Sequence, residues 1–225
     1  MLYTLVIMKH DTKALGLVED FFKDAPVLEY AKGANILRAE DVPYGVYYLK
    51  SGYVRQYLLS PSGDTFIIHI YKPHSFFPLP WILNDTPNMF YFEAMTKTSV
   101  VRGSKEQFLE FLDTNPMVMK YAAQRLAAGM HGLINRVGQL VLDDAYRKTV
   151  LLLLYYIDNF ADTVHGELML KVPLAHREIA SWIGTTRETA SLQIEKLQKK
   201  GIIATRGRLL VVRDLAKLQQ EARVE

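Results

Sequence analysis

The chain contains no cysteine among its 225 residues. Disulfide bonds, thiol redox sensing and iron–sulfur clusters held by cysteine thiolates are therefore excluded. The longest apolar run, Val150–Ile157, is much shorter than the roughly 20 residues that a membrane-spanning helix needs. The apolar start Met1–Met8 lacks a basic segment and a small-residue cleavage motif, so we expect no signal peptide and a cytoplasmic protein with no membrane contact.

Sites of chemistry are also scarce. His69, His74 and His131 show neither HxH nor HExxH spacing, and no catalytic triad or glycine-rich phosphate loop has convincing spacing. We therefore expect no cofactor, no metal and no enzymatic activity. The chain has no internal repeat or low-complexity tract, and its 49% hydrophobic content is ample for the core of a globular protein.

What the chain does have is a helix, a tight turn and a second helix near its C-terminal end. The first helix, His176–Ile183, is followed by Gly184, where a left-handed turn residue is needed. A capping box over Thr185–Glu188, with the Thr185 hydroxyl as the cap, opens the second helix, which Gly201 closes. The first helix turns one apolar face inward: Ile179, Ala180 and Ile183.

The second helix has two different faces. One face packs on the first helix and carries Ala190, Ile194 and Leu197 at helical spacing. The opposite face is free to meet a partner, and a recognition helix meets base edges and phosphates in this way. It carries Glu188, Ser191, Leu192, Glu195 and Lys199, with Arg187 on its flank.

A short hairpin is predicted after the second helix. Ile202–Ala204 and Leu209–Val212 flank the turn Thr205–Arg208, whose tip offers two guanidinium groups. Two helices and this wing form a winged helix-turn-helix. We predict that its DNA-binding residues are Thr186, Arg187, Glu188, Ser191, Leu192, Arg206 and Arg208.

The alternative is that the two helices only bury apolar surface and meet no DNA. The charge distribution favours DNA. From Lys171 to the end there are eleven Lys or Arg and six Asp or Glu, whereas the preceding residues carry 16 and 18. A basic C-terminal segment on a slightly acidic body suits the neutralisation of phosphates.

This stretch resembles the Crp/Fnr family of transcription regulators. The resemblance rests on Arg177–Ala180, Gly184, Arg187–Thr189 and Gly201–Ile203, which fit the family pattern without a gap. Leu192 departs from it, because the family usually has a second arginine there. The base specificity of the family therefore does not carry over to this chain.

The first half of the chain is predicted to be rich in β-structure. A helix over Asp11–Lys23, capped by Asp11 or Thr12, comes first. Short strands follow at even spacing, with a hairpin turn at Ser60–Asp64, and indicate a β-roll or barrel. Gly45–Leu49 and Ser51–Arg55 resemble the β-roll of the Crp/Fnr family, so the resemblance covers about Tyr30 to Leu218. The predicted strands are Ala34–Arg38, Gly45–Leu49, Tyr53–Leu59, Thr65–Tyr71, Met89–Met95 and Thr98–Val101.

The resemblance also implies where a cyclic nucleotide would bind. Family members that bind one use Gly-Glu and, about ten residues on, Arg-Ser, but this chain has Pro78-Leu79 and Met89-Phe90 at those positions. A buried phosphate without its cation is costly, so we expect no cyclic nucleotide. Aromatic residues crowd the segment instead and either fill the core or bind an apolar or planar effector. They are Phe76, Phe77, Trp81, Phe90, Tyr91 and Phe92, and the candidate effector pocket is Phe77, Leu79, Trp81, Met89 and Phe90.

A long helix separates the two regions. A capping box at Ser104–Gln107 opens a short helix that ends at Leu112, and Asn115 then caps the long one, with Pro116 at its first position. A heptad seam favours a parallel partner helix and hence a homodimer, although a helix packed only on its own β-roll is the alternative. The seam residues are Met119, Ala123, Leu126, Met130, Leu133, Val137 and Leu140. Asp143-Asp144 starts the next helix, which runs to Phe160.

Together these patterns predict an α+β protein. We expect a jelly-roll-like β-roll sensor domain over residues 1–114, a dimerisation helix over 115–142 and a winged helix-turn-helix domain over 143–225. The predicted function is that of a homodimeric transcription regulator that binds an inverted repeat in double-stranded DNA. Its partners would be RNA polymerase and an unidentified small-molecule effector. The alternative is a regulatory or scaffold protein of the same fold that acts through protein partners without DNA.

Overall fold

The computed structural model describes residues 12–164, 167–172, 174–207 and 209–223. The chain divides into two compact units. Of the described residues, the C-terminal unit comprises Ser60–Phe66 and those from Ile134 onward, and the N-terminal unit comprises those from Thr12 to Leu59 and Ile67–Leu133. The expectations for Met1–Met8, Asp11 and Arg208 lie outside the described residues.

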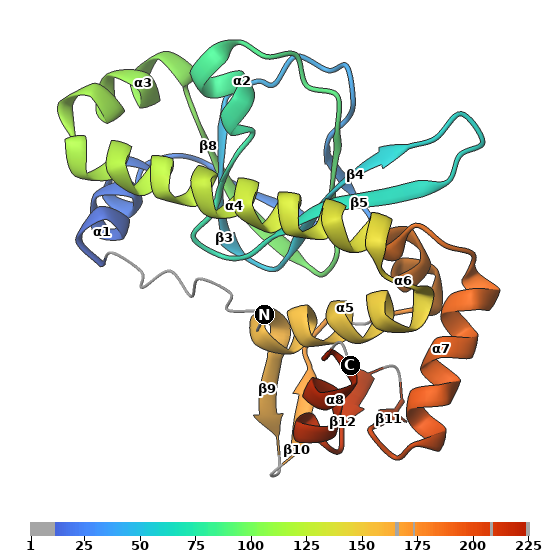
Figure 1. The fold of residues 1–225 in the computed structure, drawn as a ribbon. Coiled ribbons are helices and arrows are strands. Elements are labelled where there is room, and N and C mark those ends of the chain that lie inside the picture. The colour runs from blue at the N-terminus through green and yellow to red at the C-terminus, as the bar shows by residue number, and fades with distance from the viewer. Residues whose placement is uncertain (1–11, 165–166, 173, 208, 224–225) are drawn as a thin grey trace. The chain divides into compact units, whose positions relative to one another are not determined.

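The N-terminal unit contains two four-stranded sheets, with strand orders β1-β8-β3-β6 and β2-β7-β4-β5. Figure 1 labels the strands β3, β4, β5 and β8 of these sheets. All the predicted strands are present, with ends within two residues of the expected ones. The strands β1 and β6 were not predicted, because both are short. The bounds are β1 Val27–Tyr30, β2 Asn35–Leu37, β3 Val46–Ser51, β4 Val54–Leu59, β5 Thr65–Tyr71, β6 Phe76–Phe77, β7 Tyr91–Ala94 and β8 Thr98–Gly103.

Three helices accompany these sheets. The helix α1, Thr12–Phe21, ends two residues before the predicted end. The helix α3, Lys105–Thr114, begins at the predicted cap, where the Ser104 hydroxyl accepts from the Gln107 amide, and ends two residues late. The helix α2, Leu79–Asn84, replaces an irregular segment in the prediction.

The core of this unit consists of two hydrophobic clusters. One joins α1 and α3 to the first sheet and includes Val18, Tyr48 and Phe108. The other fills the roll between the sheets and includes Phe77 and Phe92, whose rings stack with centroids 5.0 Å apart. Phe77 is fully buried there, so it serves as core.

The helix α4 is continuous over Pro116–Leu142, as predicted. Asn115 is the residue before the helix, as predicted, and its carbonyl accepts from the Val118 and Met119 amides. Its side-chain amide donates to the Phe111 carbonyl at 2.9 Å and so closes α3. One side of α4 is buried in the N-terminal core through Val118, Tyr121 and Ala122, none of which is a seam residue. Seam residues remain exposed: Met119 by 36%, Met130 by 63%, Leu133 by 44% and Val137 by 53%.

The C-terminal unit continues with α5, Ala145–Phe160, which the Asp144 carboxylate caps as predicted by accepting from the Arg147 amide. A four-stranded sheet follows, with the order β11-β12-β10-β9. The hairpin β9–β10 and the helix α8 were not predicted. The remaining bounds are β9 Ala161–Val164, β10 Glu167–Leu170, α6 His176–Ile183, α7 Arg187–Lys199, β11 Ile203–Arg206, β12 Leu209–Val212 and α8 Leu215–Glu221.

Candidate nucleic-acid interface

The helix α6 and the turn after it have the predicted form. The backbone amide of Ala175 donates to the Glu178 carboxylate at 2.9 Å, which ties the first turn of α6. Gly184 ends the helix with φ +65°, a left-handed conformation in which a side chain would be strained. The buried residues include the three predicted ones, Ile179, Ala180 and Ile183, together with Trp182.

The helix α7 begins one residue later than expected. Its cap is Thr186, whose hydroxyl accepts from the Thr189 amide at 3.1 Å. The predicted capping box of Thr185 and Glu188 is therefore wrong, because two adjacent threonines are equally good caps and the backbone selects the second. The correction leaves the Glu188 side chain exposed in the first turn of the helix.

The two predicted faces of α7 are present. Ala190, Ile194 and Leu197 are buried, and Gln193 is buried beside them, which its polarity did not indicate. On the outer face Arg187 and Glu188 are exposed and Leu192 is 56% exposed. Further along, Glu195 pairs with Lys199 at 2.8 Å, and this hydrogen bond lowers the pKa of the Glu195 carboxyl. The outer face thus presents the cationic Arg187 and the anionic Glu188 in its first turn and the apolar Leu192 in its second.

The wing is an antiparallel hairpin of β11 and β12, in which Arg206 is opposite Leu209. The Arg206 side chain, near the tip of this hairpin, has a charged partner. Its Nη1 atom lies 2.8 Å from the Glu167 carboxylate, to which Arg213 also binds. Glu167 belongs to β10, a strand that the sequence did not reveal, and it holds the guanidinium of Arg206 in place while 56% of that side chain stays exposed.

Ser191 makes a contact that sequence spacing does not predict. Its hydroxyl lies 2.6 Å from Nδ1 of His176, the first residue of α6. The same histidine lines a crevice of about 130 Å³ between the two helices and the wing. The other lining residues are Leu174, Ala175, Ile179, Ile194, Thr205, Leu209 and Leu210. His176 therefore joins the candidate interface, although its residue type and position gave no signal.

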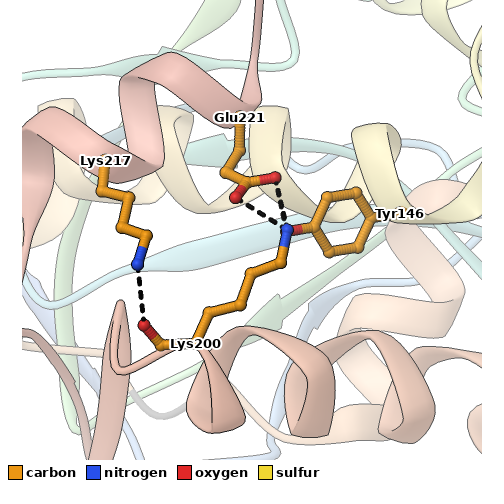
Figure 2. A network of polar contacts seen from close by, with 4 residues as sticks. All are labelled: Tyr146, Lys200, Lys217 and Glu221. Atoms are coloured by element: carbon orange, nitrogen blue, oxygen red, sulfur yellow. Dashed lines mark hydrogen bonds and ion pairs between the residues drawn. The ribbon is translucent and has the colours of Figure 1, made fainter.

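The C-terminal end of α7 is fixed by a polar network, which Figure 2 shows around Lys200. The Lys200 ammonium donates to both carboxylate oxygens of Glu221 in α8, at 2.7 and 2.8 Å, and to the Tyr146 hydroxyl of α5 at 3.0 Å. Lys217 of α8 donates to the Lys200 carbonyl at 3.2 Å. The hydrogen bond from Lys200 lowers the pKa of Glu221, and the same bond raises the pKa of Lys200.

The segment Pro78–Phe90, where the resemblance places the phosphate of a cyclic nucleotide, is called the cassette below. It lines a small cavity of about 40 Å³ in the N-terminal unit. Trp81 and Phe90 of the candidate effector pocket line it, whereas Leu79 packs on the core and Met89 is 66% exposed. The polar groups at the cavity are neutral. The Tyr71 hydroxyl donates to Gln56 at 3.2 Å, and burial raises the pKa of Tyr71. The other lining residues are Pro78, Pro80, Thr86, Pro87, Asn88 and Phe92.

The histidines of the N-terminal unit have structural contacts. His74 Nδ1 lies 2.9 Å from the Tyr48 hydroxyl and 3.1 Å from the Glu19 carboxylate, and the His69 ring packs edge-on against Tyr71. Among the described residues, no three His, Asp or Glu side chains gather as metal ligands. No helix within the described part of the chain is both long and apolar enough to cross a membrane.

Comparison with known families matches both parts of the chain. The family described as the cyclic nucleotide-binding domain matches residues 27–115, and the Crp-like helix-turn-helix domain matches residues 149–221. Each match covers one of the two regions that the sequence distinguished.

Individual proteins extend the similarity over most of the chain. The nitrogen fixation regulation protein FixK of Rhizobium meliloti is 25% identical over 80% of this chain and 79% of its own. The CRP-like cAMP-activated global transcriptional regulator of Mycobacterium tuberculosis is 20% identical over 89% of this chain and 90% of its own. The solved structure of FixK2 from Bradyrhizobium japonicum is 25% identical, with a TM-score of 0.76 over 89% of this chain and 98% of that one.

Proposed function

Because the chain belongs to the Crp/Fnr family of DNA-binding transcription regulators, we propose that it acts in the cytoplasm as a homodimer on an inverted-repeat operator. The observation that carries this proposal is the outer face of α7. Arg187, Glu188 and Leu192 project from it without being buried by the rest of the chain. Such a face can enter a major groove, where each base pair presents its own pattern of donors, acceptors and methyl groups.

The remaining contacts would come from the cap and the wing. Thr186 lies at the N-terminus of α7, where the helix dipole favours a phosphate. Ser191 lies in the second turn, half-buried and in contact with His176. The exposed part of Arg206 would bind the DNA backbone while its Nη1 atom stays with Glu167. Arg208, predicted to do the same, lies outside the described residues.

The dimer is supported by the exposed seam of α4. The residues of this helix that lie in the core of the N-terminal unit are others. The seam residues Met119, Met130, Leu133 and Val137 are exposed and available to a second copy, while Leu126 and Leu140 are half-buried. Gly129 and Gly132 have open space around the position of a Cβ atom, which would let two backbones approach closely. Burying a heptad seam against its own copy is the ordinary way to cover such an apolar stripe.

We propose that a cyclic nucleotide does not control this protein. The cavity at the cassette is lined by apolar and neutral polar residues, and a cyclic phosphate would have no cation among them. An effector that fits such a lining would be small and apolar or planar, with Trp81 and Phe90 in contact with it. RNA polymerase is the protein partner that transcription control would require.

Selection from a pool of random duplex DNA tests the proposal. The expected product is an inverted repeat with half-site centres about 34–36 Å apart, because the dimer axis relates two recognition helices. Affinity for that site should fall steeply with salt as counterions are released. A protein that shows no salt-dependent affinity for duplex DNA would instead fit the scaffold function.

A further inference from the structure

The hydrogen bond between His176 and Ser191 connects the outer face of the recognition helix to the helix before it. His176 is the first residue of α6, and Ser191 lies in the second turn of α7, where it is half-buried. The Nδ1 and Oγ atoms are 2.6 Å apart. The neighbours of Ser191 on the outer face, Glu188 and Leu192, are exposed, so the serine has DNA on one side and the imidazole on the other if α7 reads bases.

The direction of this hydrogen bond depends on which ring nitrogen of His176 carries the proton. An imidazole with its proton on Nε2 accepts the Ser191 hydroxyl proton at Nδ1. A serine hydroxyl has a single proton. Once that proton points at His176, the oxygen of Ser191 presents only lone pairs to any other partner.

We propose that His176 determines base specificity by fixing Ser191 as a hydrogen-bond acceptor. This inference rests on the proposed function, in which α7 lies in the major groove. A pure acceptor selects an exocyclic amine, so the base at Ser191 would be cytosine, through N4, or adenine, through N6. A serine whose hydroxyl rotates freely accepts or donates and discriminates poorly. His176 is thus a positioning residue that touches no base itself.

The experiment is selection from random duplex DNA at neutral pH. For the wild type we expect cytosine or adenine about five- to tenfold above guanine or thymine at one position of each half-site. Ser191→Ala should lose the preference at that position. The remaining positions of the operator should be unchanged.

Two variants of His176 distinguish positioning from general support of the fold. His176→Phe removes the ring nitrogens and should abolish the preference, while total DNA affinity stays within about threefold because phosphate contacts are untouched. His176→Asn offers an amide oxygen that accepts a hydrogen bond, so it should keep the amine preference.

The possible failures are distinct. A wild type that selects guanine or thymine at that position, or a His176→Phe variant that keeps the wild-type preference, overturns the role of His176 and leaves the proposed function intact. Absence of any sequence-selective DNA binding overturns both.

Discussion

The guanidinium of Arg136 lies over the ring of Trp182, 4.2 Å from its centroid, and Nη2 donates to the carbonyl of the same residue at 2.7 Å. Phe66, from the Ser60–Phe66 segment of the same unit, lies against the guanidinium at 4.7 Å. Arg136 is only 7% exposed. The Arg136 guanidinium, in contact with the rings of Trp182 and Phe66, thus joins the end of α4 to α6.

Replacing Arg136 by alanine should destabilise the C-terminal unit by about 3 kcal/mol. The change removes a desolvated cation–π contact and a charge-assisted hydrogen bond, and it leaves the Trp182 carbonyl without this donor. Urea unfolding of the variant measures the loss. Arg223→Ala, at an exposed arginine near the end of the chain, is the matched control and should stay within about 0.5 kcal/mol of the wild type.

Replacing Leu133 by aspartate should dissociate the proposed dimer. The charge would enter an interface that excludes water, so association and operator binding should be lost together. Sedimentation equilibrium at micromolar concentration provides the measurement. Gln124→Asp adds the same charge at an exposed position of α4 off the seam and should leave the dimer intact. A wild-type protein that sediments as a monomer would contradict the prediction.

Cyclic AMP and cyclic GMP should bind no better than millimolar, which corresponds to about −4 kcal/mol. The reason is the lining of the cassette cavity, whose polar groups, such as Gln56 and Thr86, are neutral. Met89 stands where the resemblance places the phosphate-binding arginine. Titration calorimetry of the whole chain with each nucleotide is sufficient. Micromolar affinity for either would mean that another surface supplies the cation.

Replacing Leu192 by arginine should change the selected operator. The leucine is 56% exposed and offers only apolar contact, most naturally to a thymine methyl group, whereas an arginine pairs with guanine. We expect guanine at that step, with discrimination of about 1–3 kcal/mol. Glu188→Ala should instead relax one neighbouring position, because it removes an acceptor for the cytosine amine. Unchanged consensus sequences with tight binding in both variants would show that α7 is not the reading helix.

The Lys200–Glu221 pair should contribute to stability in a pH-dependent way. Lys200 lowers the pKa of Glu221 below its ordinary 4.5, so the contribution is present above that value and disappears as pH falls through the lower folded-state pKa. Thermal unfolding of the wild type and Glu221→Gln should differ by less than about 1 kcal/mol near neutral pH, since solvent screens this exposed pair. The two curves should converge in acid. Glu110→Gln, at an exposed glutamate of α3, should show no such convergence.

Sequence periodicity predicted the parts of the fold that depend on local patterning. The face of α7 followed from Ala190, Ile194 and Leu197, because helical spacing alone determines which side chains share a side. The strand β5 was predicted to the residue, since a strong turn at Ser60–Asp64 precedes it. For the elements that were predicted, the errors lie at the ends of helices and strands. An example is the start of α7, where the hydroxyl of either Thr185 or Thr186 could serve as the cap.

The missing elements were short or depended on distant contacts. The helix α2 has six residues and a proline at its start, too few for an apolar period to develop. Glu167 meets Arg206, and Ser191 meets His176, across separations that no local pattern encodes. The site predicted from the sequence therefore contained the outward-facing side chains of α7 and of the wing. It lacked His176 and Glu167, which contact and orient them.

The two tryptophans are divided between the units, Trp81 in α2 and Trp182 in α6. Each has a cation above its ring, Lys105 at 4.5 Å and Arg136 at 4.2 Å, so each indole emits from its own electrostatic surroundings. Trp81→Phe leaves tryptophan fluorescence that reports only on the helix-turn-helix, and Trp182→Phe leaves a tryptophan signal confined to the cavity that Trp81 lines. Since the chain has no cysteine, one introduced thiol would be a unique point for attaching a dye. The protein thus carries a separate optical probe in each of its two units.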